Sequence, residues 1–118
     1  MPTFPIHKKH QRPEHFLQVR IANYLRSKDI FFFAVPNGGK RDEEVGFNLK
    51  LEGVLAGVSD LIIRHEGKVY FVEIKNGTKG VQSPTQKVFQ AMVEYQGFPY
   101  LIWRFYEDAI EFVKGLKI

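Results

Sequence analysis

Residues 57–75 read GVSDLIIRHEGKVYFVEIK. Two apolar runs in this stretch, Leu61 to Ile63 and Val69 to Ile74, flank the pair Glu66-Gly67. Runs rich in β-branched residues on either side of a short turn signal are typical of an antiparallel hairpin with a two-residue loop. We therefore expect the chain to be organised around one β-hairpin.

Counting inward from that loop places Asp60 directly opposite Glu73. Opposed residues have Cβ atoms roughly 4.5–5.5 Å apart, where like charges are destabilising. A divalent cation would compensate, because Mg²⁺ and Mn²⁺ favour oxygen ligands. The register thus predicts a Mg²⁺ or Mn²⁺ site at Asp60 and Glu73, with Lys75 in reach of whatever the ion holds. Since side chains alternate along a strand, one face is expected to carry Asp60, Ile62, Phe71, Glu73 and Lys75, and the other Leu61, Ile63, Tyr70, Val72 and Ile74.

The composition suits one intracellular domain with an anionic partner. The 118-residue chain is 44% hydrophobic and has no cysteine, so it can form neither disulfides nor thiolate-bound zinc. Residues 1–12 predict a flexible basic N-terminal arm, and residues 13–118 a single domain. A net charge of +4 favours a polyanion. No apolar run approaches the ~20 residues of a membrane span and no secretion signal is present, so we expect a cytoplasmic protein that contacts no membrane.

Apolar periodicity and cap signals predict the remaining elements. Helices are expected at residues 13–27, 42–53, 84–97 and 108–116, a strand buried on both faces at residues 30–35, and a last, buried strand at residues 100–105. The third helix should continue through Val88, Phe89, Met92, Val93 and Tyr95, with its aromatic and Met positions, Phe89, Met92 and Tyr95, as the core stripe. The predicted fold class is α/β, a mixed β-sheet with a central antiparallel hairpin flanked by helices.

Three polar features each allow two interpretations. Glu14 is either a first-turn residue favoured by the helix dipole or an acid aimed into a site. Residues 36–41 form either an ordinary turn or a glycine-rich cradle for a phosphate. Gln86 is either the partner of Ser83 in a capping box or a site residue, and the limited reach of one amide argues against both roles together.

The order Gly-Val-Ser-Asp, hairpin, Glu-Ile-Lys resembles the Asp…Glu-X-Lys core of the PD-(D/E)XK nucleases, and more narrowly their VRR-NUC branch. The glycine-framed run GVLAGVSDL at residues 53–61 and the loop PNGGKR at residues 36–41 are similar to stretches of that family. Glu14 and Gln86 also match family positions. The resemblance spans roughly residues 14–109 and implies a restriction-endonuclease-like core.

The resemblance implies a Mg²⁺- or Mn²⁺-dependent endodeoxyribonuclease. Lys75 would either help activate the attacking water or stabilise negative charge at the phosphate. The implied catalytic set is Glu14, Asp60, Glu73, Lys75 and Gln86. The implied metal ligands are Asp60, Glu73, the backbone carbonyl of Ile74 and, directly or through water, Glu14. Contacts to DNA phosphates, weakening with salt, are expected from Asn37, Lys40, Arg41, Lys79 and Lys87.

Stand-alone members of that family form homodimers and act on branched DNA such as Holliday junctions, so the resemblance implies both for this chain. Two alternatives stay open. One is a nicking or restriction-type endonuclease on duplex or single-stranded DNA. The other is a non-catalytic DNA-binding module of the same fold, against which the intact acid-acid-lysine set counts.

Overall fold

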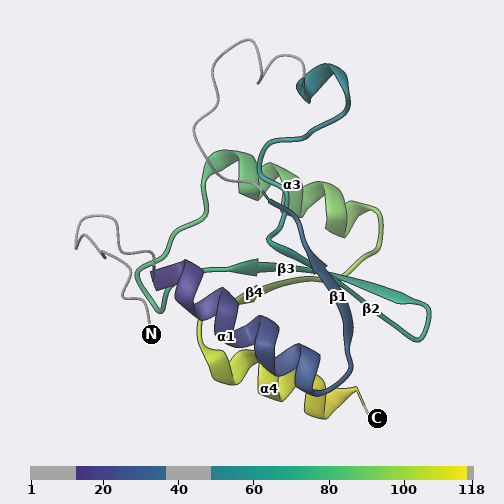
Figure 1. The fold of residues 1–118 in the computed structure, drawn as a ribbon. Coiled ribbons are helices and arrows are strands. Elements are labelled where there is room, and N and C mark those ends of the chain that lie inside the picture. The colour runs from purple at the N-terminus through teal and green to yellow at the C-terminus, as the bar shows by residue number, and fades with distance from the viewer. Residues whose placement is uncertain (1–12, 37–48, 117–118) are drawn as a thin grey trace.

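The structure is a computed structural model that describes residues 13–36 and 49–116. The predicted basic arm and the predicted phosphate contacts Asn37, Lys40 and Arg41 lie outside these ranges. The elements are, in chain order, α1 (Pro13–Ser27), β1 (Phe31–Ala34), β2 (Leu61–His65), β3 (Lys68–Ile74), α3 (Pro84–Tyr95), β4 (Tyr100–Trp103) and α4 (Tyr106–Gly115) (Figure 1).

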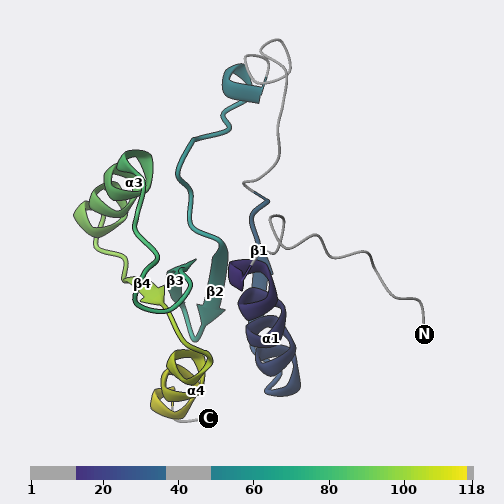
Figure 2. The ribbon, with the colours of Figure 1, turned by 90° about the vertical axis from the view of Figure 1, so that its left-hand side faces the viewer.

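A mixed four-stranded sheet in the order β1-β2-β3-β4 forms the centre of the domain. β1 and β2 pair antiparallel, as do β2 and β3, whereas β3 and β4 are parallel. α1 and α4 lie together on one face of the sheet, and α3 covers the other (Figures 1 and 2). This is the α/β arrangement that the sequence predicts. None of the helices in the described ranges has the length and apolar character needed to cross a membrane.

The β2–β3 hairpin has the predicted register, with His65 opposite Lys68 and Leu61 opposite Val72. Its loop residues Glu66 and Gly67 both have positive φ angles, of 48° and 79°. A type I′ turn requires this geometry, and its twist matches that of the flanking strands. The turn therefore fixes which side chains share a face.

Each face of the sheet buries its own set of apolar side chains. Full burial of one aliphatic side chain contributes about 1.5–3 kcal/mol. The alternation predicted for the hairpin is found, with Phe71 packed toward α3 against Phe89, Val93 and Tyr100. The core on the opposite face includes Leu61, Ile63, Val72 and Ile74 of the hairpin, Ile21 and Leu25 of α1, Trp103 of β4, and Ala109 and Val113 of α4.

β1 differs from the predicted strand with two buried faces. It spans Phe31–Ala34 rather than residues 30–35, and the side chains of Phe31 and Phe33 are 62% and 48% exposed. β1 forms one edge of the sheet, whereas α3 packs on β4 at the other edge. The face of β1 that carries these two rings is therefore open to solvent.

The core stripe of α3 is narrower than predicted. Within this helix Phe89 and Val93 are buried, whereas Val88, Met92 and Tyr95 are exposed. α3 lies alone on its face of the sheet, so it has no neighbouring helix among the described elements to cover its flanks. The prediction that Met92 and Tyr95 face the core was wrong.

The boundary between β4 and α4 also differs from the prediction. β4 ends at Trp103 and α4 begins at Tyr106, two residues before the predicted start. The Asp108 carboxylate accepts hydrogen bonds from the backbone N–H groups of Arg104 at 2.8 Å and Phe105 at 3.0 Å. These bonds satisfy donors at the start of the helix and so fix its first turn earlier in the chain.

Gly57 brings the segment before β2 against the start of α3. Its φ angle is +82°, and a Cβ atom at this position would lie 2.4 Å from the carbonyl oxygen of Thr85. Only glycine allows the two backbones to approach so closely. The contact holds the turn that carries Asp60 beside the turn that carries Gln86.

We expect Gly57→Ala to destabilise the protein more than Gly67→Ala. The two glycines have similar φ angles, +82° and +79°, but a Cβ at Gly67 would meet nothing within 4 Å. Both variants should lose about 1–2 kcal/mol to left-handed backbone strain. Gly57→Ala should lose about 1–3 kcal/mol more through overpacking. Urea unfolding measures the difference, and equal losses would show that the Gly57–Thr85 approach does not constrain the fold.

Candidate active site

Asp60 sits at the entry to β2, where it links three strands. Its backbone carbonyl accepts a hydrogen bond from Val35 N at 2.9 Å, and its side-chain Oδ2 accepts one from Ile74 N at 2.6 Å. Burial raises the pKa of the Asp60 carboxyl, the bond from Ile74 opposes this rise, and the negative charges of Glu73 and Glu14 add to it. Asp60 is therefore a carboxylate held in a place that disfavours its charge.

Glu73 is a carboxylate with no exposed surface at all. Its Oε1 accepts hydrogen bonds from the Tyr100 hydroxyl at 2.5 Å and from Gln82 Nε2 at 3.2 Å. Its Oε2 is buried and accepts no hydrogen bond from the described residues, although Lys75 Nζ lies 3.9 Å away. Oε1 is thus fixed by two hydrogen bonds, whereas Oε2 faces the positive charge of Lys75.

Lys75 is held by the first turn of α3. The residue is 6% exposed, and its Nζ donates a hydrogen bond to Gln86 Oε1 at 2.9 Å. The same Oε1 accepts a bond from the Ser83 backbone N–H at 2.8 Å, which completes the predicted capping box. The expectation that one amide could not serve both roles was wrong, because a carbonyl oxygen has two lone pairs.

Tyr100 and Gln82 are contacts of Glu73 that the sequence did not reveal. A buried phenol is expected to find a hydrogen-bond partner, so Tyr100 carried a signal that a polar group lies nearby. Identifying that group requires the parallel register, in which Phe71 is paired with Tyr100 and Glu73 with Ile102. Burial raises the pKa of the Tyr100 hydroxyl and its bond to Glu73 raises it further, so the phenol stays a donor.

A divalent cation fits this donor set. Asp60 and Glu73 act on each other electrostatically, and Glu73 Oε2 is a buried anionic oxygen with no hydrogen bond from the described residues. Leaving such an oxygen without a hydrogen bond costs free energy, and a hard cation, which prefers oxygen ligands, would compensate for this cost. These two carboxylates therefore offer the oxygen ligands and the negative charge that Mg²⁺ or Mn²⁺ prefers.

Glu14 stands apart from the other two acids. It is exposed in the first turn of α1, and it influences Asp60 through its charge. Within residues 13–36 and 49–116, no group of three acidic or imidazole side chains is arranged to hold a metal ion. The part of Glu14 as a ligand, direct or through water, stays a prediction, as does that of the Ile74 carbonyl.

Two predicted phosphate contacts lie on the surface of the protein. Lys79 and Lys87 are both exposed, the first in the loop after β3 and the second in α3. Lys79 lines a hollow of about 580 Å³ together with Glu14, His15, Gln18 and Asn76. This hollow therefore lies between the first turn of α1 and the loop of residues 76–80.

Two solved structures share the fold of this chain. One, described as a "VRR_NUC domain protein", aligns with a TM-score of 0.73 over 90% of this chain and 88% of that chain, at 19% identity. Another, described as "VRR_NUC domain", aligns with a TM-score of 0.65 over 88% of this chain and 97% of that chain, at 14% identity. No family model and no curated protein matches the sequence. The chain has the fold of a VRR-NUC domain, which confirms the fold that the resemblance predicts.

We expect Asp60→Asn to stabilise the protein in EDTA at neutral pH. The pKa of Asp60 is raised on folding, so folding disfavours its charge. This loss of stability is complete at pH values above the pKa of Asp60 in the folded protein. It vanishes at pH values below the pKa in the unfolded chain, which is about 3.9. Asparagine keeps an acceptor for the Ile74 N–H and removes the charge.

Thermal unfolding as a function of pH measures this gain, which should shrink as the pH falls through the raised pKa. Asp108→Asn is the matched control, since Asp108 also accepts backbone hydrogen bonds but caps a helix. A melting temperature for Asp60→Asn at or below that of the natural protein at pH 7 would contradict the described environment of Asp60.

Tyr100→Phe should destabilise the protein by about 1–3 kcal/mol, because it removes a hydrogen bond from a buried acceptor. Tyr24→Phe is the control, since Tyr24 also packs against the core but without a bond to Glu73. Denaturant unfolding compares the two. Equal losses would show that the Tyr100 hydroxyl does not support Glu73.

Proposed function

We propose that this protein is a metal-dependent endonuclease that hydrolyses phosphodiester bonds in DNA, with a preference for branched DNA such as Holliday junctions. The observation that carries the proposal is the buried Glu73 Oε2, which lies beside Lys75 and accepts no hydrogen bond from the described residues. The VRR-NUC fold supports the proposal.

Mg²⁺ or Mn²⁺ would be held by Asp60 and Glu73, with the Ile74 carbonyl and Glu14 as further proposed ligands. Bound there, the ion would lower the pKa of a water molecule and neutralise charge on the phosphate. Tyr100 and Gln82 would keep Glu73 oriented by holding its other oxygen.

Lys75 is positioned to act on the phosphate. Gln86 fixes its ammonium group and the ion pair with Glu73 suits its positive charge. We therefore favour the role in which Lys75 stabilises negative charge that develops on the phosphate oxygens. Gln86 is anchored by the helix cap, so its hydrogen bond would keep the ammonium group of Lys75 from moving closer to the carboxylates.

DNA is the proposed partner, bound by a homodimer. Lys79 and Lys87 are exposed and would contact flanking phosphates, so affinity should fall steeply with salt. Two active sites related by a two-fold axis would suit a four-way junction, which has matching symmetry. Each subunit of the dimer would therefore cleave one of two strands of the junction.

Asp60→Ala should lower cleavage at least about 100-fold, because it removes a charge that the metal-assisted reaction requires. Binding to DNA in EDTA should change little. Junction, flap, duplex and single-stranded DNA are compared in Mg²⁺ and in Mn²⁺, with Glu111→Ala as a control, since Glu111 is exposed on α4. The melting temperature of the natural protein, but not of Asp60→Ala, should rise with either metal.

Cleavage that survives in Asp60→Ala would remove the proposed chemistry. Cleavage of plain duplex in preference to junctions would replace the branched substrate with a restriction-type one. If the natural protein binds DNA but does not cleave it, the protein is a non-catalytic DNA-binding module.

A further inference from the structure

β1 carries two exposed aromatic rings that the proposed chemistry does not use. Phe31 and Phe33 point to the same face of the strand, on which Arg64 is the cross-strand partner of Phe31 and is also exposed. Residues two apart on a strand lie about 6.6–6.8 Å apart. That is roughly twice the ~3.4 Å rise per nucleotide of a stacked strand, so each ring can accept a separate base.

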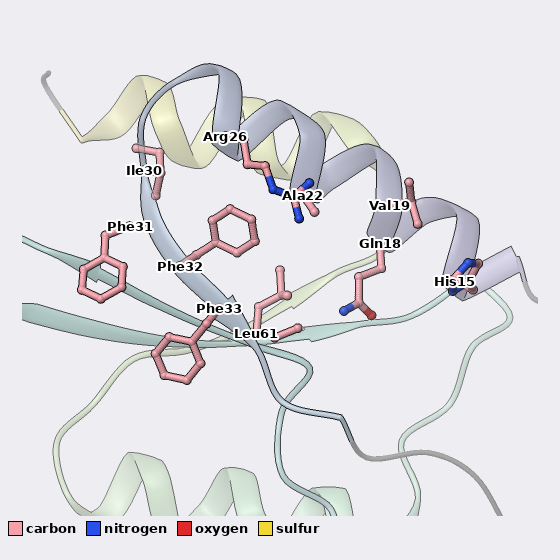
Figure 3. A pocket seen from close by; sticks show the side chains of 11 residues that line it. His15, Gln18, Val19, Ala22, Arg26, Ile30, Phe31, Phe32, Phe33 and Leu61 are labelled. Carbon is pink, nitrogen blue, oxygen red and sulfur yellow. The ribbon is translucent and has the colours of Figure 1, made fainter.

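A groove runs along the other side of the free edge of β1. We call it the α1–β1 groove, a hollow of about 440 Å³ lined by His15, Gln18, Val19, Ala22, Arg26 and residues 30–34, with Leu61 (Figure 3). Gln18, Arg26 and the ring of Phe32 lie between the strand and α1, whereas the rings of Phe31 and Phe33 lie on the far side of the strand (Figure 3).

The charges of this groove suit an anion. Arg26 is fixed by a hydrogen bond from Nη1 to Asn23 Oδ1 at 3.0 Å, and its guanidinium lies 5.6 Å from the centre of the Phe32 ring. No acidic side chain is among the described residues that line the groove. A chain of phosphates is therefore favoured over an acidic or neutral peptide.

The groove continues toward Glu14 in the first turn of α1. His15 and Gln18 line both the α1–β1 groove and the hollow that contains Glu14 and Lys79. The strand itself ends beside the acids, because Val35 N donates to the Asp60 carbonyl. Phe31 and Val35 are about 13 Å apart along the strand, which is the length of roughly four stacked nucleotides.

We propose that this surface binds a single-stranded segment of DNA that leads into the active site. The phosphates of the segment lie in the α1–β1 groove near Arg26, and its bases turn over the free edge of β1 to stack on Phe31 and Phe33. The inference rests on the proposed function and adds to it a binding surface for an unpaired strand next to the scissile phosphate of branched DNA.

Binding of a fluorescent oligothymidylate in EDTA tests the proposal without any cleavage. The double variant Phe31→Ala/Phe33→Ala should bind it more weakly by about tenfold or more for each lost ring. Binding to blunt duplex should be unchanged. Tyr95→Ala is the control, because it removes a ring that is 88% exposed at the far end of α3, and it should leave single-strand binding intact.

Phe33→Trp gives a second readout that does not depend on loss of binding. It keeps an aromatic ring, so it should bind the oligonucleotide as the natural protein does, and the fluorescence of the new indole should be quenched by the stacked base. Trp103 is 4% exposed and should report little of this change. This variant also covers the case in which the double variant fails to fold.

Unchanged oligonucleotide binding by the double variant, or unquenched Phe33→Trp fluorescence, would overturn the proposal. So would a shift from dimer to monomer in sedimentation of the double variant with no loss of binding, which would assign the rings to a second copy of the chain. Ring-dependent binding of single strands, together with absence of cleavage on every substrate, would refute the proposed hydrolysis and support the binding surface.

Discussion

The structure depends on a carboxylate buried in the middle of a sheet. Glu73 has no exposed surface, and moving a charge into such a place costs several kcal/mol unless partners compensate. Tyr100 from β4 and Gln82 from the loop before α3 hold one oxygen, while Lys75 faces the other. These contacts connect the hairpin to both of its C-terminal neighbours. An apolar side chain of similar size at position 73 would avoid the cost of burying a charge.

That arrangement explains why the site is organised as two linked halves. The carboxylates lie at the end of the hairpin, and Lys75 is held away from full pairing with them by an amide that also caps α3. Gly57 brings the two halves together, because only a residue without a side chain fits against Thr85. Groups that are costly to bury and closely positioned by their neighbours are typical of sites kept for chemistry rather than for stability.

Much of this could be predicted from local patterns. The hairpin register followed from one turn, α1 from its apolar periodicity, and the Ser83–Gln86 cap from its spacing, since each is encoded within a few residues. Long-range features could not be predicted. The open face of β1 depends on which strand forms the edge, and the Tyr100–Glu73 bond depends on a parallel register between distant segments. The early start of α4 depends on a carboxylate three residues inside the helix.

We propose that Asp60 and Glu73 together hold one divalent cation. A crystal of the protein grown with Mn²⁺ and measured for anomalous scattering tests it directly. The account predicts an anomalous peak bound to Glu73 Oε2 and to a carboxylate oxygen of Asp60. Mn²⁺ bound elsewhere, or Glu73 Oε2 still without an ion at a saturating concentration, would contradict it.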